Sequence, residues 1–403
     1  MPMQALAQAP AVILGLIALA GCAETLAGLV LVRRFARRPP PMPRHRPPIS
    51  VLKPLAGAEP LLEEALASLC RQDYPEFQIV CGAREASDPA LAVARRLAAR
   101  FPDRDITLVH GSGVHGPGIH EARPSEAANR KIANLIDMLK AARHEILVIA
   151  DADVHALPGY LDAIAAALEI PGTGLVTALY TGRPGAPGWV AKLGASGITH
   201  GFLPAALLAR ALGRQDALGA TLALRREVLA RAGGLEVLAD ELADDAVLGR
   251  RVAALGLAVR LAASVPATTV PEHRLGALFR HELRWGRTMR SLVPAGYAAS
   301  AIRYPIPWAL LAVAISGGAP WSVALLALAW AVRAIAMRGI DRSLGLAPVL
   351  PIWLIPARDA LSLAVLLVSY TGDRVEWRGA VLRAGRPGSG NSLRASRKGS
   401  RDR

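Results

Sequence analysis

The sequence predicts an α/β domain held between membrane segments, and three observations lead to this prediction. Short apolar strands alternate with helical patterns between the first two long apolar blocks, as in sheets covered by helices. The apolar blocks, residues 11–32, 306–336 and 346–370, reach the length of about 20 residues that crosses a bilayer core. The chain is 52% hydrophobic with a mean hydropathy of +0.32, yet its net charge is +15. This combination is typical of a membrane protein with a basic cytosolic face.

Composition disfavours several classes of function. The three cysteines, Cys22, Cys70 and Cys81, form neither a disulfide framework nor a metal-binding Cys-x-x-Cys pair. Aromatic residues make up only 4% of the chain, which weakens a nucleic-acid surface built on base stacking. The first strand is followed neither by a P-loop nor by a complete Gly-x-Gly-x-x-Gly motif, so an ATPase or a dinucleotide enzyme is disfavoured.

The first apolar block, residues 11–32, predicts an N-terminal transmembrane helix that is interrupted only by Glu24. A cleaved signal peptide is the alternative, but the run is too long for one and lacks a preceding basic segment. Because arginines that flank a span stay in the cytosol, the sequence predicts an external N-terminus and a cytosolic domain after the span. These arginines are Arg33, Arg34, Arg37, Arg38, Arg44 and Arg46.

The two later blocks predict a C-terminal membrane region. Gly317 to Pro320 break the second block, so residues 306–316 are too short to cross and are expected to be interfacial or re-entrant. Residues 321–336 make most of one crossing. Arg358 and Asp359 stand near the middle of the third block, which is costly unless they face protein or the membrane interface. Packing of this segment on the membrane surface is the alternative.

The domain between the membrane segments alternates strand and helix. Such alternation predicts a parallel sheet with helices on both faces, in which ligands bind at the carboxyl ends of the strands. The predicted strands cover residues 49–53, 77–81, 106–109 and 145–150, and the predicted helices cover residues 61–69, 90–99 and 126–142.

Asp151 and Asp153 follow directly after the apolar strand at 146–150. Two carboxylates at the ligand edge of a sheet suit Mg²⁺ or Mn²⁺, which prefer oxygen ligands and share them with a diphosphate. An aspartate turn or helix cap before Leu157 and Pro158 is the alternative.

Two further motifs carry charge near predicted helix starts. Lys131 opens the helix before the aspartate strand, where it could face a phosphate or simply lie in a solvated first turn. Asp244 and Asp245 precede an apolar helical stretch. Such a residue is most often a cap, although in a sugar-transferring enzyme it can be the general base.

Residues 275–287 predict a basic amphipathic helix just before the second apolar block. Arg280, Arg284 and Arg287 recur at helical spacing on one face. The helix could lie on the lipid interface, present guanidinium groups to a diphosphate, or do both. His200 leaves two options open, because it could line an acceptor site or be a loop or core histidine.

These motifs together resemble family 2/21-type membrane glycosyltransferases of the ceramide glucosyltransferase-like group. That group has an early Asp, a second Asp ending a strand, a third Asp and then (Gln/Arg)-x-x-Arg-Trp. The matching positions are Asp88, Asp151, Asp245 and Arg284-Trp285, together with Lys53-Pro54-Leu55-Ala56-Gly57 and Ala232-Gly233-Gly234. At position 281 this chain has His where the group has Gln or Arg.

Within the group, several strings are most similar to hopanoid-biosynthesis glycosyltransferases. Two of them are Asn129-Arg130-Lys131 and His281-Glu282-Leu283-Arg284-Trp285; ceramide-type enzymes tend to have Asn-Pro-Lys in place of the first. The resemblance implies a GT-A fold, the Rossmann-like nucleotide-diphospho-sugar transferase fold, and inverting transfer from a UDP-sugar to a lipid hydroxyl. For the hopanoid branch the donor is UDP-N-acetylglucosamine and the acceptor bacteriohopanetetrol.

The resemblance also implies roles for the donor side of the site. Asp88 is expected to contact the nucleoside, and Lys131 and Arg284 the diphosphate. Asp151 is expected to bind the donor and, with Asp153, to hold Mg²⁺ or Mn²⁺.

On the acceptor side, Asp245 is expected to take the proton from the attacking hydroxyl, with Asp244 beside it in the catalytic set. Arg284 and Trp285 complete that set. Trp285 and His281 are expected to line the acceptor pocket.

The expected organisation has four parts: an anchor over residues 1–34, a cytosolic GT-A domain over 35–300, a membrane region over 301–372 and a basic flexible tail over 373–403. The expected location is the bacterial inner membrane, crossed several times, with the catalytic domain in the cytosol. Expected partners are a UDP-sugar, a hopanoid or sphingolipid acceptor and the membrane, without nucleic acid. The alternatives are a ceramide or other lipid glucosyltransferase using UDP-glucose, a processive polysaccharide synthase, a transporter, and nucleic-acid binding by the tail.

Overall fold

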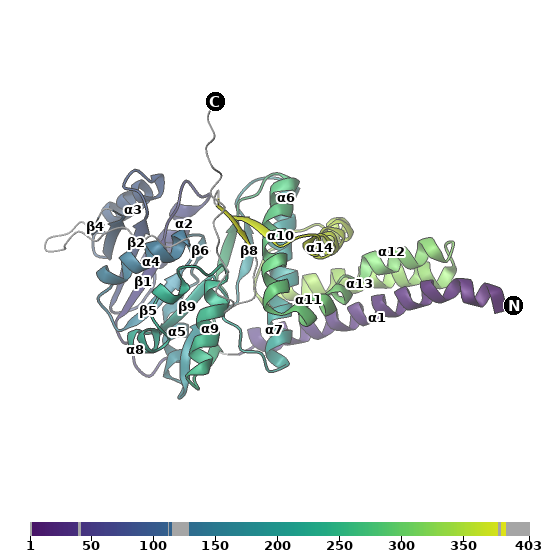
Figure 1. Cartoon of the computed structure of the whole chain (residues 1–403), viewed down its shortest axis with the longest axis horizontal. Coiled ribbons are helices and arrows are strands. Elements are labelled where there is room, and N and C mark those ends of the chain that lie inside the picture. The colour runs from purple at the N-terminus through teal and green to yellow at the C-terminus, as the bar shows by residue number, and fades with distance from the viewer. Residues whose placement is uncertain (1, 39–41, 112, 115–128, 378–379, 384–403) are drawn as a thin grey trace, which may run out of the picture. The chain divides into compact units, whose positions relative to one another are not determined.

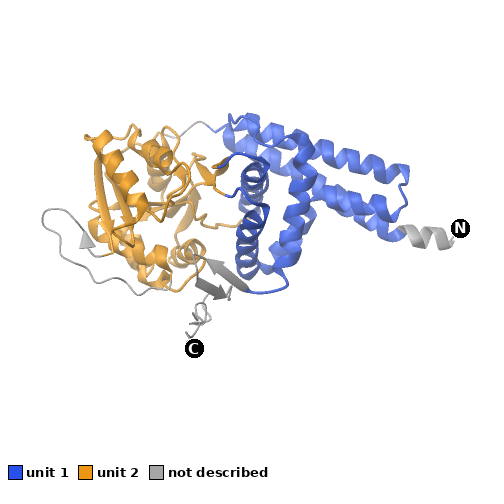
Figure 2. Ribbon diagram, turned by 90° about the horizontal axis from the view of Figure 1, so that it is seen from above, with its two compact units in different colours: residues 1–38, 186–212, 272–375 blue, residues 39–185, 213–271, 376–403 orange. Residues whose placement is uncertain are grey.

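The computed structural model describes residues 2–38, 42–111, 113–114, 129–377 and 380–383. The described chain forms two compact units, and Figure 2 shows unit 1 in blue and unit 2 in orange. Unit 1 comprises residues 1–38, 186–212 and 272–375, and unit 2 comprises 39–185, 213–271 and 376–403. Residues 186–212, placed inside the 35–300 domain from the sequence, therefore group with the membrane segments. The predicted domain boundaries stay predictions, and most of the predicted tail lies outside the described residues.

Unit 2 is built on an eight-stranded sheet with the order β10-β7-β9-β5-β1-β2-β3-β4. Figure 1 labels β1, β2, β4, β5 and β9 of this sheet. A second sheet has the order β6-β11-β8, and β12 pairs with β13. The strands are β1 (Ile49–Pro54), β2 (Phe77–Ala83), β3 (Asp105–His110), β4 (Gly113–Val114), β5 (Ile146–Ala150), β6 (Val154–His155), β7 (Thr173–Thr177), β8 (Thr181–Pro184), β9 (Thr221–Arg225), β10 (Ala258–Leu261), β11 (Ala267–Val270), β12 (Arg374–Trp377) and β13 (Ala380–Arg383).

Helices cover both faces of the large sheet, because its central strands are apolar on both sides. In β5, Ile146 and Val148 pack in one core with α2, α3 and α5, whereas Leu147 and Ile149 pack in the opposite core with α4, α8 and α9. Near-continuous apolar strands of this kind are typical of sheets buried on both faces. The helices are α2 (Leu62–Cys70), α3 (Pro89–Arg100), α4 (Arg130–Ala141), α5 (Tyr160–Glu169), α8 (Arg226–Arg231) and α9 (Asp244–Ala254), with the short η2 (Glu236–Leu238).

The four predicted strands and three predicted helices are confirmed, with ends that shift by a few residues. The predicted helix over residues 126–142 begins at Arg130 in the structure, and residues 126–128 lie outside the described chain. The four predicted strands are parallel to one another, as expected, and the complete sheet is mixed in part because of β9, which was not predicted. β9 runs antiparallel to both of its neighbours, β5 and β7, while β1, β2, β3 and β5 are parallel.

The antiparallel strand has a consequence for the sheet's ligand edge. Thr221 at the start of β9 pairs with Ala150 at the end of β5. The amide of Asp151 donates to the carbonyl of Ala220 at 3.1 Å. The segment before β9 therefore reaches the same edge as Asp151, which a parallel strand in this position would not allow.

Unit 1 is helical. It contains α1 (Pro2–Ala36), α6 (Trp189–Ser196), the π-helix η1 (Gly197–Phe202), α7 (Leu203–Ala211), α10 (Leu275–Leu292), α11 (Pro294–Ala299), η3 (Ser300–Arg303), α12 (Pro305–Ile315), α13 (Pro320–Ser343), η4 (Ile352–Leu354) and α14 (Ile355–Ser369). Helix α1 packs along α12 and α13, and α10 packs along α14.

Within the described residues, three helical segments are long and apolar enough to cross a membrane: Ala9–Ala36, Pro320–Ser343 and Ile352–Ser369. A fourth candidate is the pair Pro294–Arg303 and Pro305–Ile315, which is bent by 63°. Such a bend is found in a broken span or a re-entrant loop. It agrees with the interpretation of residues 306–316 as too short to cross alone.

The charged pair in the third apolar block faces protein, which is one of the arrangements that the sequence left open. The guanidinium of Arg358 donates to both oxygens of Glu282 at 2.6 Å. Asp359 accepts from Arg333 at 2.6 Å. Arg358 and Asp359 are both buried, which fits the rule that charges in membrane segments pair with one another.

Candidate active site

Four aspartates and two lysines of unit 2 gather at the carboxyl edge of the large sheet. Asp151 and Asp153 follow β5, and Asp244 and Asp245 form the first turn of α9. Lys131 stands in the first turn of α4, and Lys53 near the end of β1. We call these six residues the aspartate cluster. Their common edge is where ligands bind in open α/β sheets.

Lys131 joins the two aspartate pairs. Its Nζ lies 2.8 Å from Asp151 Oδ1 and 3.5 Å from Asp244 Oδ2. Burial alone would lower the pKa of Lys131, but Asp151 and Asp244 raise it above its ordinary value. Lys131 is therefore a permanent cation at the point where a diphosphate is expected.

Asn129 holds this arrangement in place. Its Oδ1 accepts from the amides of Lys131 and Ile132 at 3.0 and 3.3 Å, which caps α4. Its Nδ2 donates to the carbonyl of Glu241 at 2.8 Å. The cap of α4 is thus tied to the segment that leads into α9, which brings Lys131 to Asp244.

Asn129→Ala is expected to lower the free energy of unfolding by about 0.5–2 kcal/mol, the usual effect of losing an N-cap. It should also lower activity, because the tether to Glu241 is lost. Asn129→Asp keeps a capping oxygen but removes the Nδ2 donor. Thermal unfolding should separate the two variants, while activity should fall in both; full activity in Asn129→Asp would contradict the tether.

Lys53 was recognised in the sequence only as part of a family string, and the structure buries it beneath the cluster. Its Nζ donates to the carbonyls of Asp151 at 2.5 Å and Val154 at 3.3 Å. Burial lowers the pKa of Lys53 to about 8, against the opposing effect of Asp153. Lys53 therefore fixes the turn that carries Asp151 and Asp153.

Two carboxylates of the cluster are less acidic than usual. Burial, followed by Asp151 and Glu59, raises the pKa of Asp153 to about 7. Burial, followed by Asp244, raises the pKa of Asp245 to about 7. Four carboxylates face only two ammonium groups, so the cluster holds more negative charge than its own lysines neutralise.

Asp244 and Asp245 do not cap α9. The N-cap residue is Ala243, which makes no side-chain cap. Asp245 Oδ1 instead accepts from the next amide, that of Ala246, at 2.8 Å. Since these side chains are not used as caps, the alternative interpretation of this motif as a structural cap is wrong.

Asp88, by contrast, has a structural use. Its Oδ1 accepts from the amide of Ala90 at 2.9 Å, which caps α3, and from the amide of Gly57 at 3.0 Å. The carboxylate thus joins the loop after β1 to the helix after β2. Contact with a nucleoside stays a prediction for this residue.

Gly219 and Tyr180 complete the surroundings of Asp245. A Cβ atom at Gly219 would lie 3.0 Å from Asp245 Oδ2. Burial, followed by the charges of Asp245 and Asp151, raises the pKa of Tyr180, so its phenol stays protonated. Neither residue was identified from the sequence, because neither belongs to a recognisable charged motif.

Gly219→Ala is expected to lower kcat about tenfold, because small displacements of a catalytic group have large effects on rate. Gly296→Ala is a matched control, since a Cβ atom there meets open space. Initial rates at saturating donor would test the pair. Equal rates for the two variants would show that the absence of a side chain at Gly219 is not needed to place Asp245 for catalysis.

The motif residues of unit 1 lie on α10. His281 Nδ1 lies 2.5 Å from Glu272 Oε1. The rings of His281 and Trp285 make an edge contact with centroids 4.6 Å apart. The hydrogen bond with His281 lowers the pKa of Glu272, although burial opposes this. Trp285 is exposed.

The structure therefore brings five of the nine predicted site residues together in unit 2 and places three others on one helix of unit 1. Asp151, Asp153, Asp244, Asp245 and Lys131 form one cluster with the unpredicted Lys53. His281, Arg284 and Trp285 share α10, and Asp88 is a helix cap. Among the described residues, no group of three or more His, Cys, Asp or Glu side chains is arranged to hold a metal by itself.

The chain is similar to two ceramide glucosyltransferases over about a third of its length. A ceramide glucosyltransferase of Komagataella phaffii is 28% identical over 140 residues, covering 34% of this chain and 26% of the relative. A ceramide glucosyltransferase of Gibberella zeae is 26% identical over 139 residues, covering 32% and 26%. The chain thus spans about a quarter of the length of these relatives.

A mannosyltransferase from Pyrobaculum calidifontis, solved in complex with GDP-Man and Mn²⁺, is 24% identical, with a TM-score of 0.49. That match covers 89% of this chain and 99% of the mannosyltransferase. The family model for glycosyl transferase family 21 matches residues 13–389, most of the 403-residue chain. With the Rossmann-like mixed sheet and the apolar helices near both ends, this match confirms the predicted fold class. The chain belongs to glycosyl transferase family 21.

Proposed function

We propose that the protein transfers a sugar from a UDP-sugar to a hydroxyl group of a membrane lipid, with inversion at the anomeric carbon. The favoured donor is UDP-N-acetylglucosamine and the favoured acceptor is the hopanoid bacteriohopanetetrol. The observation that carries the proposal is the aspartate cluster at the ligand edge of the sheet, in a chain that belongs to family 21.

The cluster supports a single displacement. Asp245, with its pKa raised to about 7, is suited to accept a proton near neutral pH. Asp244 lies beside Lys131 and is proposed to position that cation. Lys131 would bind the diphosphate of the donor. Arg284 and Trp285 of unit 1 are proposed to contact the diphosphate and the acceptor on the strength of their motif.

A divalent cation fits the cluster by charge. Two carboxylates are in excess over the lysines, and the side chain of Asp151 is 36% exposed, so its carboxylate is accessible. Asp151 and Asp153 would hold Mg²⁺ or Mn²⁺, and the remaining ligands would be diphosphate oxygens and water. The cation would neutralise charge on the departing diphosphate.

Chelation is expected to abolish activity, and added Mn²⁺ to restore it. Asp153→Asn should raise the Mn²⁺ concentration for half-maximal rate by about tenfold or more, as loss of a ligand weakens metal affinity. Asp162→Asn, a carboxylate on α5 that pairs with Arg46, is the control. Unchanged Mn²⁺ dependence in Asp153→Asn would place the metal elsewhere.

A second candidate function is ceramide glucosylation with UDP-glucose. The observation that favours it is the similarity of the chain to two ceramide glucosyltransferases. The same catalytic residues would serve both reactions, and only the recognition of donor and acceptor would differ.

We also infer that unit 2 lies in the cytosol of a bacterial cell, with unit 1 in the inner membrane as a multi-pass region. The support is the run of arginines at the end of α1 and after it, which includes Arg33, Arg34, Arg37 and Arg38. A UDP-sugar is a cytosolic metabolite, so this orientation also agrees with the proposed donor.

The test pairs two acceptors with two donors. Membranes that carry the protein are incubated with bacteriohopanetetrol or ceramide, each with UDP-N-acetylglucosamine or UDP-glucose, and the lipids are analysed by mass spectrometry. A hexosamine-hopanoid product that is absent with Asp245→Asn supports the favoured function. Glucosylceramide would replace it with the second candidate, and absence of product from every pairing would overturn both acceptors.

A further inference from the structure

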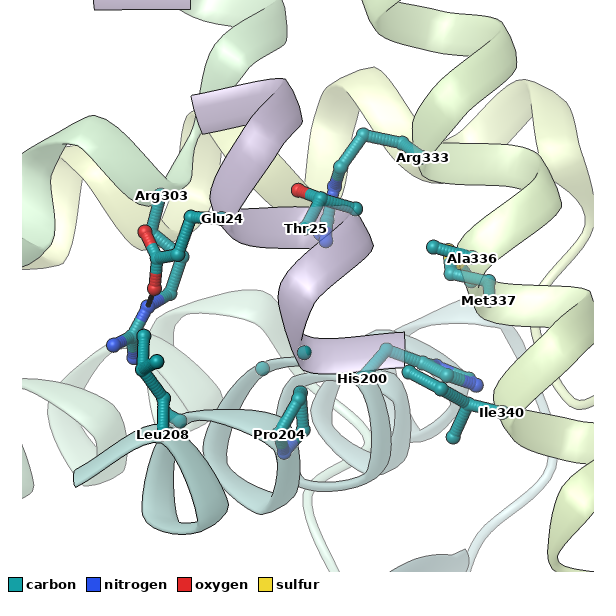
Figure 3. A pocket seen from close by; sticks show the side chains of 13 residues that line it. Glu24, Thr25, His200, Pro204, Leu208, Arg303, Arg333, Ala336, Met337 and Ile340 are labelled. Carbon is teal, nitrogen blue, oxygen red and sulfur yellow. Dashed lines mark hydrogen bonds and ion pairs between the residues drawn. The ribbon is translucent and has the colours of Figure 1, made fainter. Parts of the chain in front are cut away.

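A narrow pocket lies within unit 1, between α1, the η1–α7 segment and α13 (Figure 3). Its lining has a polar part and an apolar part. The polar part consists of Glu24, Thr25, His200, Arg303 and Arg333, and the apolar part includes Pro204, Ala205, Leu208, Ala336, Met337 and Ile340. Charged residues within apolar helices are rare and often mark a binding site. A π-helix such as η1, which contributes His200, is also frequent at functional sites.

The charged residues of the lining have partners of opposite charge. Glu24 Oε1 accepts from Arg303 Nε at 2.8 Å (Figure 3). Arg333 donates to both oxygens of Asp359. The uncharged lining residue His200 lies with its Nε2 2.8 Å from Oδ1 of Asp341, and that carboxylate also pairs with Arg338. Each arginine of the lining is thus neutralised by a carboxylate in the described structure, so the pocket is poorly suited to a phosphate or another anionic head group.

Among the described lining residues, one buried side-chain oxygen has no hydrogen-bond partner. Glu24 Oε2 is buried and accepts no hydrogen bond from any described residue. A buried charged oxygen without a donor is costly. The missing group must therefore be a hydrogen-bond donor, and because the pocket is electrically balanced, a neutral O–H group fits best.

The apolar part of the lining defines the rest of the occupant. Leu208 of α7 faces the pocket from one side and Met337 and Ile340 of α13 from another (Figure 3). These side chains suit a hydrocarbon, and α1 and α13 are both candidate membrane spans. A polar end beside an apolar wall, within membrane helices, matches a molecule that is itself part polar and part hydrocarbon.

We propose that this pocket receives a single hydroxyl group of an uncharged membrane lipid. A hydroxyl of the lipid donates to Glu24 Oε2, and its hydrocarbon part lies along Leu208, Met337 and Ile340. The inference rests on the proposed function in one respect, since a lipid alcohol is the proposed acceptor class. Binding can nevertheless be measured without sugar transfer.

The test uses photo-crosslinking of the full chain in nanodiscs. The probe is a monoacylglycerol with a diazirine and an alkyne in its acyl chain, and labelled peptides are identified by mass spectrometry. Labelling is expected in α1, α7 and α13. Ala205→Phe, which fills the pocket, should reduce it about tenfold or more. Ala206→Phe, on the same helix but outside the lining, should leave it nearly unchanged. Equal labelling of the two variants would overturn the proposal.

Competition on the unmodified protein gives a second, independent readout. Unlabelled monoacylglycerol should displace the probe, whereas its dimethyl ether, which cannot donate a hydrogen bond, should not. Equal competition by both would show ordinary lipid adsorption and overturn the site, and stronger competition by phosphatidylglycerol would overturn the choice of a neutral head. UDP binding is measured on the same samples to verify folding. Intact labelling without sugar transfer to any lipid would count against the proposed function and not against the pocket.

Discussion

Asp245→Asn is expected to lower kcat by about 10²- to 10⁴-fold, the range over which a general base contributes. Asparagine has nearly the same shape, so UDP affinity should change little. The structure adds a reason to choose Asp245 over its neighbour. Burial and Asp244 raise the pKa of Asp245 to about 7, whereas Asp244 lies 3.5 Å from the ammonium group of Lys131. Asp244 is therefore placed to position that cation, which leaves Asp245 as the candidate for the base.

Asp244→Asn is the matched control, because it changes the adjacent residue in the same way. It should lower the rate about tenfold or less, mainly through the KM of the donor, since it loosens Lys131. The pH profile separates the two further. A base must be unprotonated, so wild-type activity should fall as the pH drops below about 7. In Asp244→Asn the dependence should persist but move to lower pH, because one of the two causes that raise the pKa of Asp245 is removed. It should disappear from the residual rate of Asp245→Asn. The reverse pattern would assign the base to Asp244.

The sequence predicted four strands of unit 2, namely β1, β2, β3 and β5, because each is short, apolar and bounded by turns. The direction of β9 was beyond that reasoning. Direction depends on how the chain returns to the sheet. The chain leaves unit 2 for unit 1 over residues 186–212 and re-enters unit 2 at residue 213, shortly before β9. An interruption of this kind has no local signal in composition or periodicity.

The aspartate cluster could also be predicted only in part from the sequence. Asp151, Lys131 and Asp245 were identified as separate motifs, because each occurs at a recognisable strand end or helix start. What unites them is a contact between distant segments, the hydrogen bond from Asn129 to the carbonyl of Glu241. Lys53 was not given a role, because a buried lysine in a strand has the same sequence signal as an exposed one. Only packing distinguishes them.

The partners of the charged pair in the third apolar block could not be predicted from the sequence either. Arg358 and Asp359 are neighbours in sequence, but they pair with different helices. Arg358 binds Glu282 of α10, and Asp359 binds Arg333 of α13. The side chains of Arg333 and Asp359 are only 8% and 1% exposed. Two ion pairs thus join α14 to α10 and to α13 within unit 1.

Arg333→Met is expected to lower the free energy of unfolding by about 3–5 kcal/mol, because it leaves the carboxylate of Asp359 buried without its cation. Asp359→Leu should have a similar effect for the opposite reason. The double variant should recover most of the loss, since replacing a buried ion pair with apolar residues is often neutral. Thermal unfolding in detergent of all four proteins gives the coupling between the two positions.

Additive losses in the double variant would mean that the two side chains act independently, and that the ion pair is not what holds α13 to α14. Strong coupling with restored stability would have a different meaning. It would show that charge is not required for folding at this depth of the membrane. The cost of burying Arg333 beside Asp359 would then need another reason, and the pocket that Arg333 lines supplies one, because a neutralised arginine can shape a polar cavity without attracting anionic lipids.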